Sequence, residues 1–120
     1  PCNPLVAYGV RMDAVFRALA DPVRRILLEE LASAPGQTLY ELCVRLITHH
    51  AVRISRQGVS KHLAVLEAAG LIRVEADGRY RRHHVCLEPL TLGVAGWIRA
   101  LAPGLPPQPS GRNETEGQDP

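Results

Sequence analysis

The sequence predicts a mostly α-helical domain with a single two-stranded β-hairpin. Hydrophobic residues make up 46% of the 120 residues and aromatic residues only 4%, so a core of small aliphatic side chains is expected. Apolar residues recur at helical spacing through most of the chain. The pattern changes around Asp77-Gly78, a dipeptide typical of a tight hairpin turn. These three observations together favour a set of helices that is interrupted by one hairpin.

A single folded domain is expected over residues 10–102. Residues 1–9 are predicted to be an N-terminal arm, and residues 103–120 a disordered C-terminal tail with five prolines and no aliphatic residue after Leu105. Such a tail cannot bury enough apolar surface to offset the entropy that it would lose on ordering. The formal net charge is only +2, but seven basic residues and three acidic ones lie between Arg53 and Arg82. The charge distribution therefore predicts one local basic patch.

The cysteines favour a reducing, cytoplasmic location. Cys2, Cys43 and Cys86 are odd in number and widely spaced, so they make no disulfide framework. Arg11 and Asp13 interrupt the first apolar run before it reaches the length of a signal peptide. The composition also excludes a membrane span, so no membrane partner is expected.

Two helices are predicted in the first third of the chain. Arg11–Ala20 carries its apolar residues at helical spacing. Asp21-Pro22 then supplies the residue types preferred at an N-cap and at the first helical position. The second helix is expected to end near Pro35-Gly36, because neither residue continues a helix well.

A third helix is predicted to begin after Thr38. The spacing between Thr38 and Glu41 is that of a capping box, in which each side chain bonds the backbone of the other residue. The apolar pattern continues through Ile47, after which the end of the helix is not defined. Residues 47–54 are then expected to connect this helix to the fourth.

The fourth helix has two contrasting faces. Ser55 is its predicted N-cap, and Gly70 is expected to close it after Ala69 in a left-handed conformation. The apolar stripe consists of Val59, Leu63, Leu66 and Ala69. The opposite face of its N-terminal half consists of Arg56, Gln57, Ser60 and Lys61. One face is thus suited to the core and the other to a polar partner.

A hairpin and a last helix complete the domain. Leu71–Glu75 and Tyr80–Leu87 are predicted to be strands on either side of the turn at Asp77-Gly78. Pro89–Ala102 is predicted to be a helix with almost no charge. A helix this apolar needs cover on more than one side, and a dimer interface would supply it.

This order of elements is that of a winged helix-turn-helix. The polar half of the fourth helix offers groups that match base edges and phosphates in a major groove, and the hairpin brings arginines alongside. Double-stranded DNA is therefore the predicted partner. The predicted DNA-binding residues are Ser55, Arg56, Gln57, Ser60, Lys61, His62, Arg79, Arg81 and Arg82. The alternative for this set is a solvated polar face, and for His62 a packed or hydrogen-bonded histidine.

Three segments resemble the ArsR/SmtB family of bacterial transcriptional regulators. They are Phe16–Leu27, Val59–Ile72, which resembles the recognition helix and its connection to the wing, and Gly78–Arg81, which resembles the wing tip. The resemblance implies a homodimer that binds an inverted-repeat operator, usually as a repressor released by a metal or another signal. It also implies a dimer interface between the first and last helices. The candidate interface residues are Val15, Leu19, Leu90, Val94, Trp97, Ile98 and Leu101.

The chain departs from the metal-sensing members of this family. Where they carry Glu-Leu-Cys-Val-Cys, this sequence has Glu41-Leu42-Cys43-Val44-Arg45, so the second thiolate is replaced by a cation. The remaining candidate ligands are Cys43, His49 and His50, which would suit nickel or zinc. Because neighbouring residues on a helix point about 100° apart, the two histidines do not make a bidentate site alone. The alternative function is a metal-responsive regulator with a non-standard metal site, which either activates or represses transcription. No cofactor is required for the fold.

Two further classes of function fit the sequence less well. An enzyme could use Cys86 with His84, but no orienting acid or oxyanion-hole loop is suggested nearby. The sequence also has no Gly-rich phosphate loop, HExxH or CxxC motif, so no catalysis and no small-molecule substrate are expected. A protein-interaction module that has lost DNA binding would lack an arginine-rich wing and would bind DNA weakly and without salt dependence.

Overall fold

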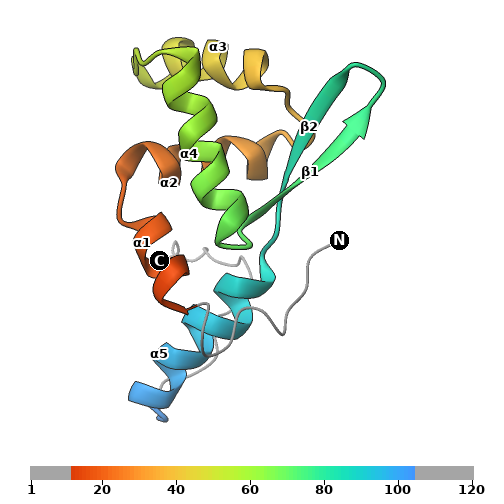
Figure 1. The fold of residues 1–120 in the computed structure, drawn as a ribbon. Helices are drawn as coiled ribbons and strands as arrows, with labels where there is room; N and C mark the ends of the chain where they lie inside the picture. The colour runs from red at the N-terminus through yellow and green to blue at the C-terminus, as the bar shows by residue number, and fades with distance from the viewer. Residues whose placement is uncertain (1–11, 105–120) are drawn as a thin grey trace, which may run out of the picture.

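The computed structural model describes residues 12–104, which form four α-helices, a hairpin and a C-terminal helical segment (Figure 1). The elements are α1 (Met12–Leu19), α2 (Pro22–Ser33), α3 (Leu39–His50), α4 (Arg56–Ala68), β1 (Ile72–Asp77), β2 (Tyr80–Val85), the π-helical segment η3 (Pro89–Val94) and α5 (Ala95–Leu101). This order confirms the predicted fold class. The predicted arm, residues 1–9, and all but the start of the predicted tail lie outside the described residues. None of the described helices combines the length and the apolar character needed to cross a membrane.

The predicted helix caps are all present. Asp21 accepts hydrogen bonds from the backbone amides of Val23 and Arg24 at 2.8 and 3.3 Å, with Pro22 in the first turn of α2. Burial raises the pKa of the Asp21 carboxyl, but the bonds from these two amides outweigh it and lower the pKa. Thr38 and Glu41 form both bonds of the capping box, at 3.2 and 2.9 Å. These contacts span three residues or fewer, which is why the sequence alone predicts them.

The core lies between the first four helices and the base of the hairpin. Its fully buried side chains include Leu27 and Leu31 from α2, Leu42 and Leu46 from α3, and Leu66 from α4. The whole predicted stripe of α4 is buried, and Gly70 has the expected left-handed φ of 79°. The core therefore fixes which face of α4 remains outside.

One cysteine departs from the expectation of unpaired thiols. Cys86, directly after β2, is 3% exposed and disulfide-bonded. Cys43 on α3 is a free thiol of intermediate exposure.

The hairpin is anchored at its base and free at its tip. Its strands pair antiparallel, and the last pair, Asp77 with Tyr80, leaves a two-residue loop in which Gly78 has φ 61°. The first strand therefore begins one residue later and ends two residues later than predicted, and the second strand ends at Val85 and not at Leu87. At the base, the Gly36 amide donates to the His83 carbonyl and the His83 amide donates to the Gln37 carbonyl, both at 2.9 Å. The connection between α2 and α3 thus holds the wing against the helices.

The last helix is not uniformly α-helical. Over η3 the backbone follows π-helical spacing, and the amide of Ala95 donates to the carbonyl of Leu90, five residues back. The ordinary α-helix begins only at Ala95. In Figure 1 this segment projects away from the other helices beside α1.

Candidate nucleic-acid interface

The start of α4 presents a polar surface to solvent. Arg56, Gln57, Ser60 and Lys61 are all exposed, while Val59 between them is fully buried in the core. Ser55 accepts a hydrogen bond from the Gly58 amide at 3.0 Å, so its hydroxyl oxygen caps the helix. The positive end of the helix dipole lies at this same end. The outer surface of α4 thus offers donors and positive charge on one side.

A cleft separates this surface from the wing. Its volume is about 870 Å³, and it is lined by residues of α3, α4 and both strands. Arg56 and Ser60 line one side, and Arg79, Arg81 and Arg82 line the other. The structure therefore brings most of the predicted DNA-binding residues of both elements to one concave surface.

Two of the predicted DNA-binding residues have partners inside the protein. The Nε of Arg82 donates to Asp77 at 2.8 Å, and its guanidinium also donates to the Gly36 carbonyl at 3.1 Å. His62 is half-buried and its Nδ1 lies 3.3 Å from the guanidinium of Arg24. Arg82 therefore braces the wing, and His62 takes the hydrogen-bonded role that the sequence left open.

Two exposed tyrosines of the cleft were not among the predicted residues. Tyr40, in the first turn of α3, is 66% exposed, and Tyr80, at the start of β2, is 53% exposed. Their hydroxyls can donate to phosphate oxygens. Tyr40 lies outside the apolar stripe of its helix, and this position in the sequence could have predicted that its side chain is exposed.

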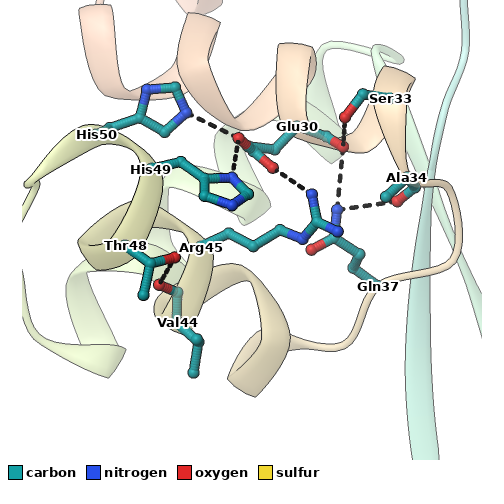
Figure 2. A network of polar contacts seen from close by, with 9 residues as sticks. All are labelled: Glu30, Ser33, Ala34, Gln37, Val44, Arg45, Thr48, His49 and His50. Atoms are coloured by element: carbon teal, nitrogen blue, oxygen red, sulfur yellow. Dashed lines mark hydrogen bonds and ion pairs between the residues drawn. The ribbon is translucent and has the colours of Figure 1, made fainter.

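The candidate metal ligands His49 and His50 instead contact one buried carboxylate, as Figure 2 shows. The Oε2 atom of Glu30 lies 3.1 Å from Nδ1 of His49 and 2.8 Å from Nε2 of His50. Arg45 donates to the other oxygen of Glu30 at 2.9 Å. Burial raises the pKa of the Glu30 carboxyl, but the bonds from Arg45, His50 and His49 outweigh it and lower the pKa to about 2. The cluster thus joins the last two turns of α3 to α2.

No metal centre is formed by these residues. Burial raises the pKa of the Cys43 thiol, partly opposed by the charge of Arg56, so its thiolate is disfavoured. Within residues 12–104 no group of three or more His, Cys, Asp or Glu is placed to hold a metal ion. The two histidines do share one partner despite their angular separation, because one reaches it through Nδ1 and the other through Nε2.

The predicted interface residues divide into three groups. Val15 is fully buried in the core of the protomer, so its side chain offers no surface to a partner. Leu19, Leu90 and Val94 are partly buried and pack against the core. Trp97, Ile98 and Leu101 are exposed.

A neighbouring aromatic residue extends the exposed group. Phe16 on α1 packs edge-to-face against Trp97 with ring centroids 5.5 Å apart. Leu92 is also exposed and lines a shallow pocket with these two rings. We call Phe16, Leu92, Trp97, Ile98 and Leu101 the apolar face.

The fold and this site define a winged helix-turn-helix DNA-binding protein. Residues 19–75 match the family model of a helix-turn-helix domain. The chain is 48% identical over 86 residues, 72% of its length, to the HTH-type transcriptional regulator YuzN of Bacillus subtilis (strain 168), and the match covers 94% of YuzN.

Solved structures agree with this class. A crystal structure of an ArsR family transcriptional regulator matches with 32% identity and a TM-score of 0.66, covering 78% of this chain and 89% of that one. An ArsR-like transcriptional regulator from Rhodococcus sp. RHA1 matches with 32% identity and a TM-score of 0.60, covering 78% and 88%. The chain belongs to the ArsR family of transcriptional regulators. It is a DNA-binding regulator and not an enzyme.

Proposed function

We propose that the protein is a homodimeric repressor that binds an inverted-repeat operator in double-stranded DNA. The observation that carries the proposal is the cleft between α4 and the wing, because exposed cationic side chains from two separate elements line it. If these side chains were only a solvated polar surface, there would be no reason for arginines from two separate elements to line the same cleft. In the helix-turn-helix mode, the N-terminal half of α4 enters a major groove.

Each polar side chain has a role in this proposal. Arg56 and Gln57 lie in the first turn of α4. A guanidinium or a side-chain amide there can make two hydrogen bonds to the edge of one base. Lys61 lies one turn further along and attracts phosphates as a point charge. The side chains of Arg79 and Arg81 on the wing have no hydrogen-bond or ion-pair partner among the described residues, so they are free to bond the DNA backbone or the minor groove beside the site.

The apolar face supports the dimeric part of the proposal. Trp97 is 51% exposed and Leu101 65% exposed, although both are large apolar side chains. Exposed apolar groups that gather on two adjacent elements mark an interaction site. A two-fold dimer through this face would present two copies of α4 to half-sites about one helical turn apart.

Binding is tested with operator sequences selected from a random pool of duplex DNA. Fluorescence anisotropy then gives the affinity for a selected duplex and for a scrambled one over a range of salt concentrations. The proposal requires tight, salt-dependent binding with a preference of about a thousandfold or more for the selected sequence. Weak binding with an affinity that does not depend on the salt concentration would instead indicate a protein-interaction module.

Arg56→Ala is expected to weaken operator binding and relax sequence choice. A lost bidentate base contact costs about 1–3 kcal/mol, and the dimer loses two, so affinity should fall about 30-fold or more. Competition between operator variants measures the discrimination at each position. Arg99→Ala removes an equivalent exposed charge on α5 and serves as the control. Unchanged discrimination in the Arg56 variant would show that base readout lies elsewhere.

Lys61→Ala is expected to lower affinity equally for all sequences. The slope of log K against log salt should become shallower by about 2, because each lost phosphate contact contributes about 0.9 and the dimer presents two copies. Titrations at four or more salt concentrations measure the slope on operator and scrambled duplexes. If the slope stays at the wild-type value, Lys61 is not a phosphate contact.

A further inference from the structure

The sequence predicted that residues 47–54 connect α3 to α4, but α3 continues to His50, so the connection is residues 51–55. This is still longer than the turn of about 3–4 residues that is usual in a helix-turn-helix. Helix α3 continues to His50 and ends at Ala51, the one described non-glycine residue in the left-handed region, with φ 55°. The chain then needs Val52, Arg53 and Ile54 before Ser55 caps α4. We call residues 51–55 the long turn.

Both ends of the long turn are fixed to the helices. The Val52 amide donates to the Leu46 carbonyl at 2.9 Å, and the Val52 side chain packs against the core. At the other end, Ser55 accepts from the Gly58 amide. The side chain of Ile54 lies against Gly58, since a Cβ built there would be 3.8 Å from its Cβ and Cδ1 atoms. The turn is thus seated against the first turn of α4.

Arg53 stands at the apex between these fixed points. It is exposed, and its guanidinium has no hydrogen-bond or ion-pair partner among residues 12–104. Other arginines are committed internally: Arg24 bonds the Ala18 carbonyl, Arg25 the Leu19 carbonyl and Arg45 the Glu30 carboxylate. The guanidinium of Arg53 is therefore available to a partner outside the protomer.

The long turn lies directly before the start of α4, which the proposed function places in a major groove. Figure 1 shows the turn and the tip of the wing at the same end of the molecule, on opposite sides of the start of α4. An α-helix with its side chains is about 10–12 Å wide and the groove is about 12 Å wide, so the inserted helix fills it. A cation beside the helix start then faces the phosphates that border the groove, on the side away from the wing.

We propose that the long turn is a second DNA-contact element in which Arg53 binds a backbone phosphate on the groove wall opposite the wing. The inference rests on the proposed function, because it requires α4 to enter a major groove. It assigns Arg53 a positioning role. The wing and the long turn contact phosphates on the two sides of the groove, and these contacts fix the register of α4 on the bases. Phosphate contacts fix register without reading sequence.

Arg53→Ala tests this inference on the full chain with selected operator and scrambled duplexes. The expected result is a slope of log K against log salt that is shallower by about 2 on the operator, with the Tm unchanged. Arg53→Lys should restore most of the slope, because an ammonium still attracts a phosphate. Arg99→Ala on α5 is the matched charge control and should leave the slope at the wild-type value.

The outcomes separate this inference from the proposed function. If the wild-type protein binds its operator and Arg53→Ala keeps the full slope, the long turn does not contact DNA and the inference is overturned. If the wild-type protein itself shows no salt-dependent preference for any duplex, the proposed function fails, and this inference fails with it. A lowered slope for Arg53→Ala that Arg53→Lys does not restore also contradicts a simple phosphate contact.

Discussion

Replacing Glu30 by alanine is expected to lower the free energy of unfolding by about 2–3 kcal/mol. The carboxylate is 7% exposed and accepts from Arg45, His49 and His50, so its removal leaves three donors at the same place without their acceptor. Breaking a fully buried ion pair costs about 3–5 kcal/mol, but these donors are partly exposed and can turn toward water. Thermal or urea unfolding followed by circular dichroism measures the change.

The neighbouring Glu29 supplies a matched control. It lies on the same helix, is exposed and has no partner among the described residues, so Glu29→Ala should change stability by less than about 0.5 kcal/mol. Equal stabilities of the two variants would mean that the Glu30 cluster does not hold α3 to α2.

The acid stability of the protein gives a second measurement of the same cluster. The pKa of Glu30 is about 2 in the folded protein against 4.5 for an ordinary glutamate. A carboxyl with a lowered folded pKa contributes stability that is complete above about pH 4.5 and is lost as the pH falls toward 2. The stability difference between wild type and Glu30→Ala should therefore shrink across this window. A difference that stays constant from pH 6 to pH 2.5 would assign the effect to packing and not to the charge.

Features that depend on neighbours in the sequence could be predicted from it. The caps at Asp21, Thr38 and Ser55 need only residues within one helical turn, and the hairpin turn needs only the glycine at position 78. Helical periodicity likewise identified the buried stripe of α4 and its exposed opposite face.

Features that depend on contacts between distant elements could not be predicted from the sequence. Glu30 and His50 are 20 residues apart, and no local pattern shows that a glutamate on α2 meets the end of α3. Glu30 does lie on the core side of α2, three residues after Leu27, which is the only hint that the helix pattern offers. Arg82 was predicted to contact DNA, and no local pattern shows that its guanidinium also bonds the Gly36 carbonyl, 46 residues away in the sequence. Local charge therefore predicted the candidate interface, but only the fold shows which of its arginines have a partner inside the protein and which have none.

The apolar face is subject to the same limit, because it forms only where α1 and α5, distant in the sequence, pack together. Val15 has helical spacing with Leu19 and shares its apolar character, but the packing of α1 on the core takes Val15 inside and leaves Phe16 on the surface. Phe16 then meets Trp97, so α1 and α5 contribute to one continuous patch. Aromatic residues at the centre of such a patch carry most of the binding energy in protein interfaces.

Trp97→Ala is accordingly expected to dissociate the proposed dimer. Loss of a central aromatic residue costs about 2–3 kcal/mol, and a two-fold interface loses two copies, so the dimer dissociation constant should rise about a thousandfold or more. Sedimentation equilibrium over a range of protein concentrations measures this constant. Because an inverted repeat is bound tightly only when both half-sites are occupied together, operator affinity should fall in parallel while binding to an isolated half-site is preserved.

Tyr40→Ala is the aromatic control for this experiment. Tyr40 is 66% exposed on α3 and lines the cleft between α4 and the wing, so its truncation should leave the dimer constant unchanged. The two variants therefore separate dimerisation from contact with DNA. A wild-type protein that sediments as a monomer at micromolar concentration, or a Trp97 variant that dimerises as well as wild type, would exclude the apolar face as the dimer interface.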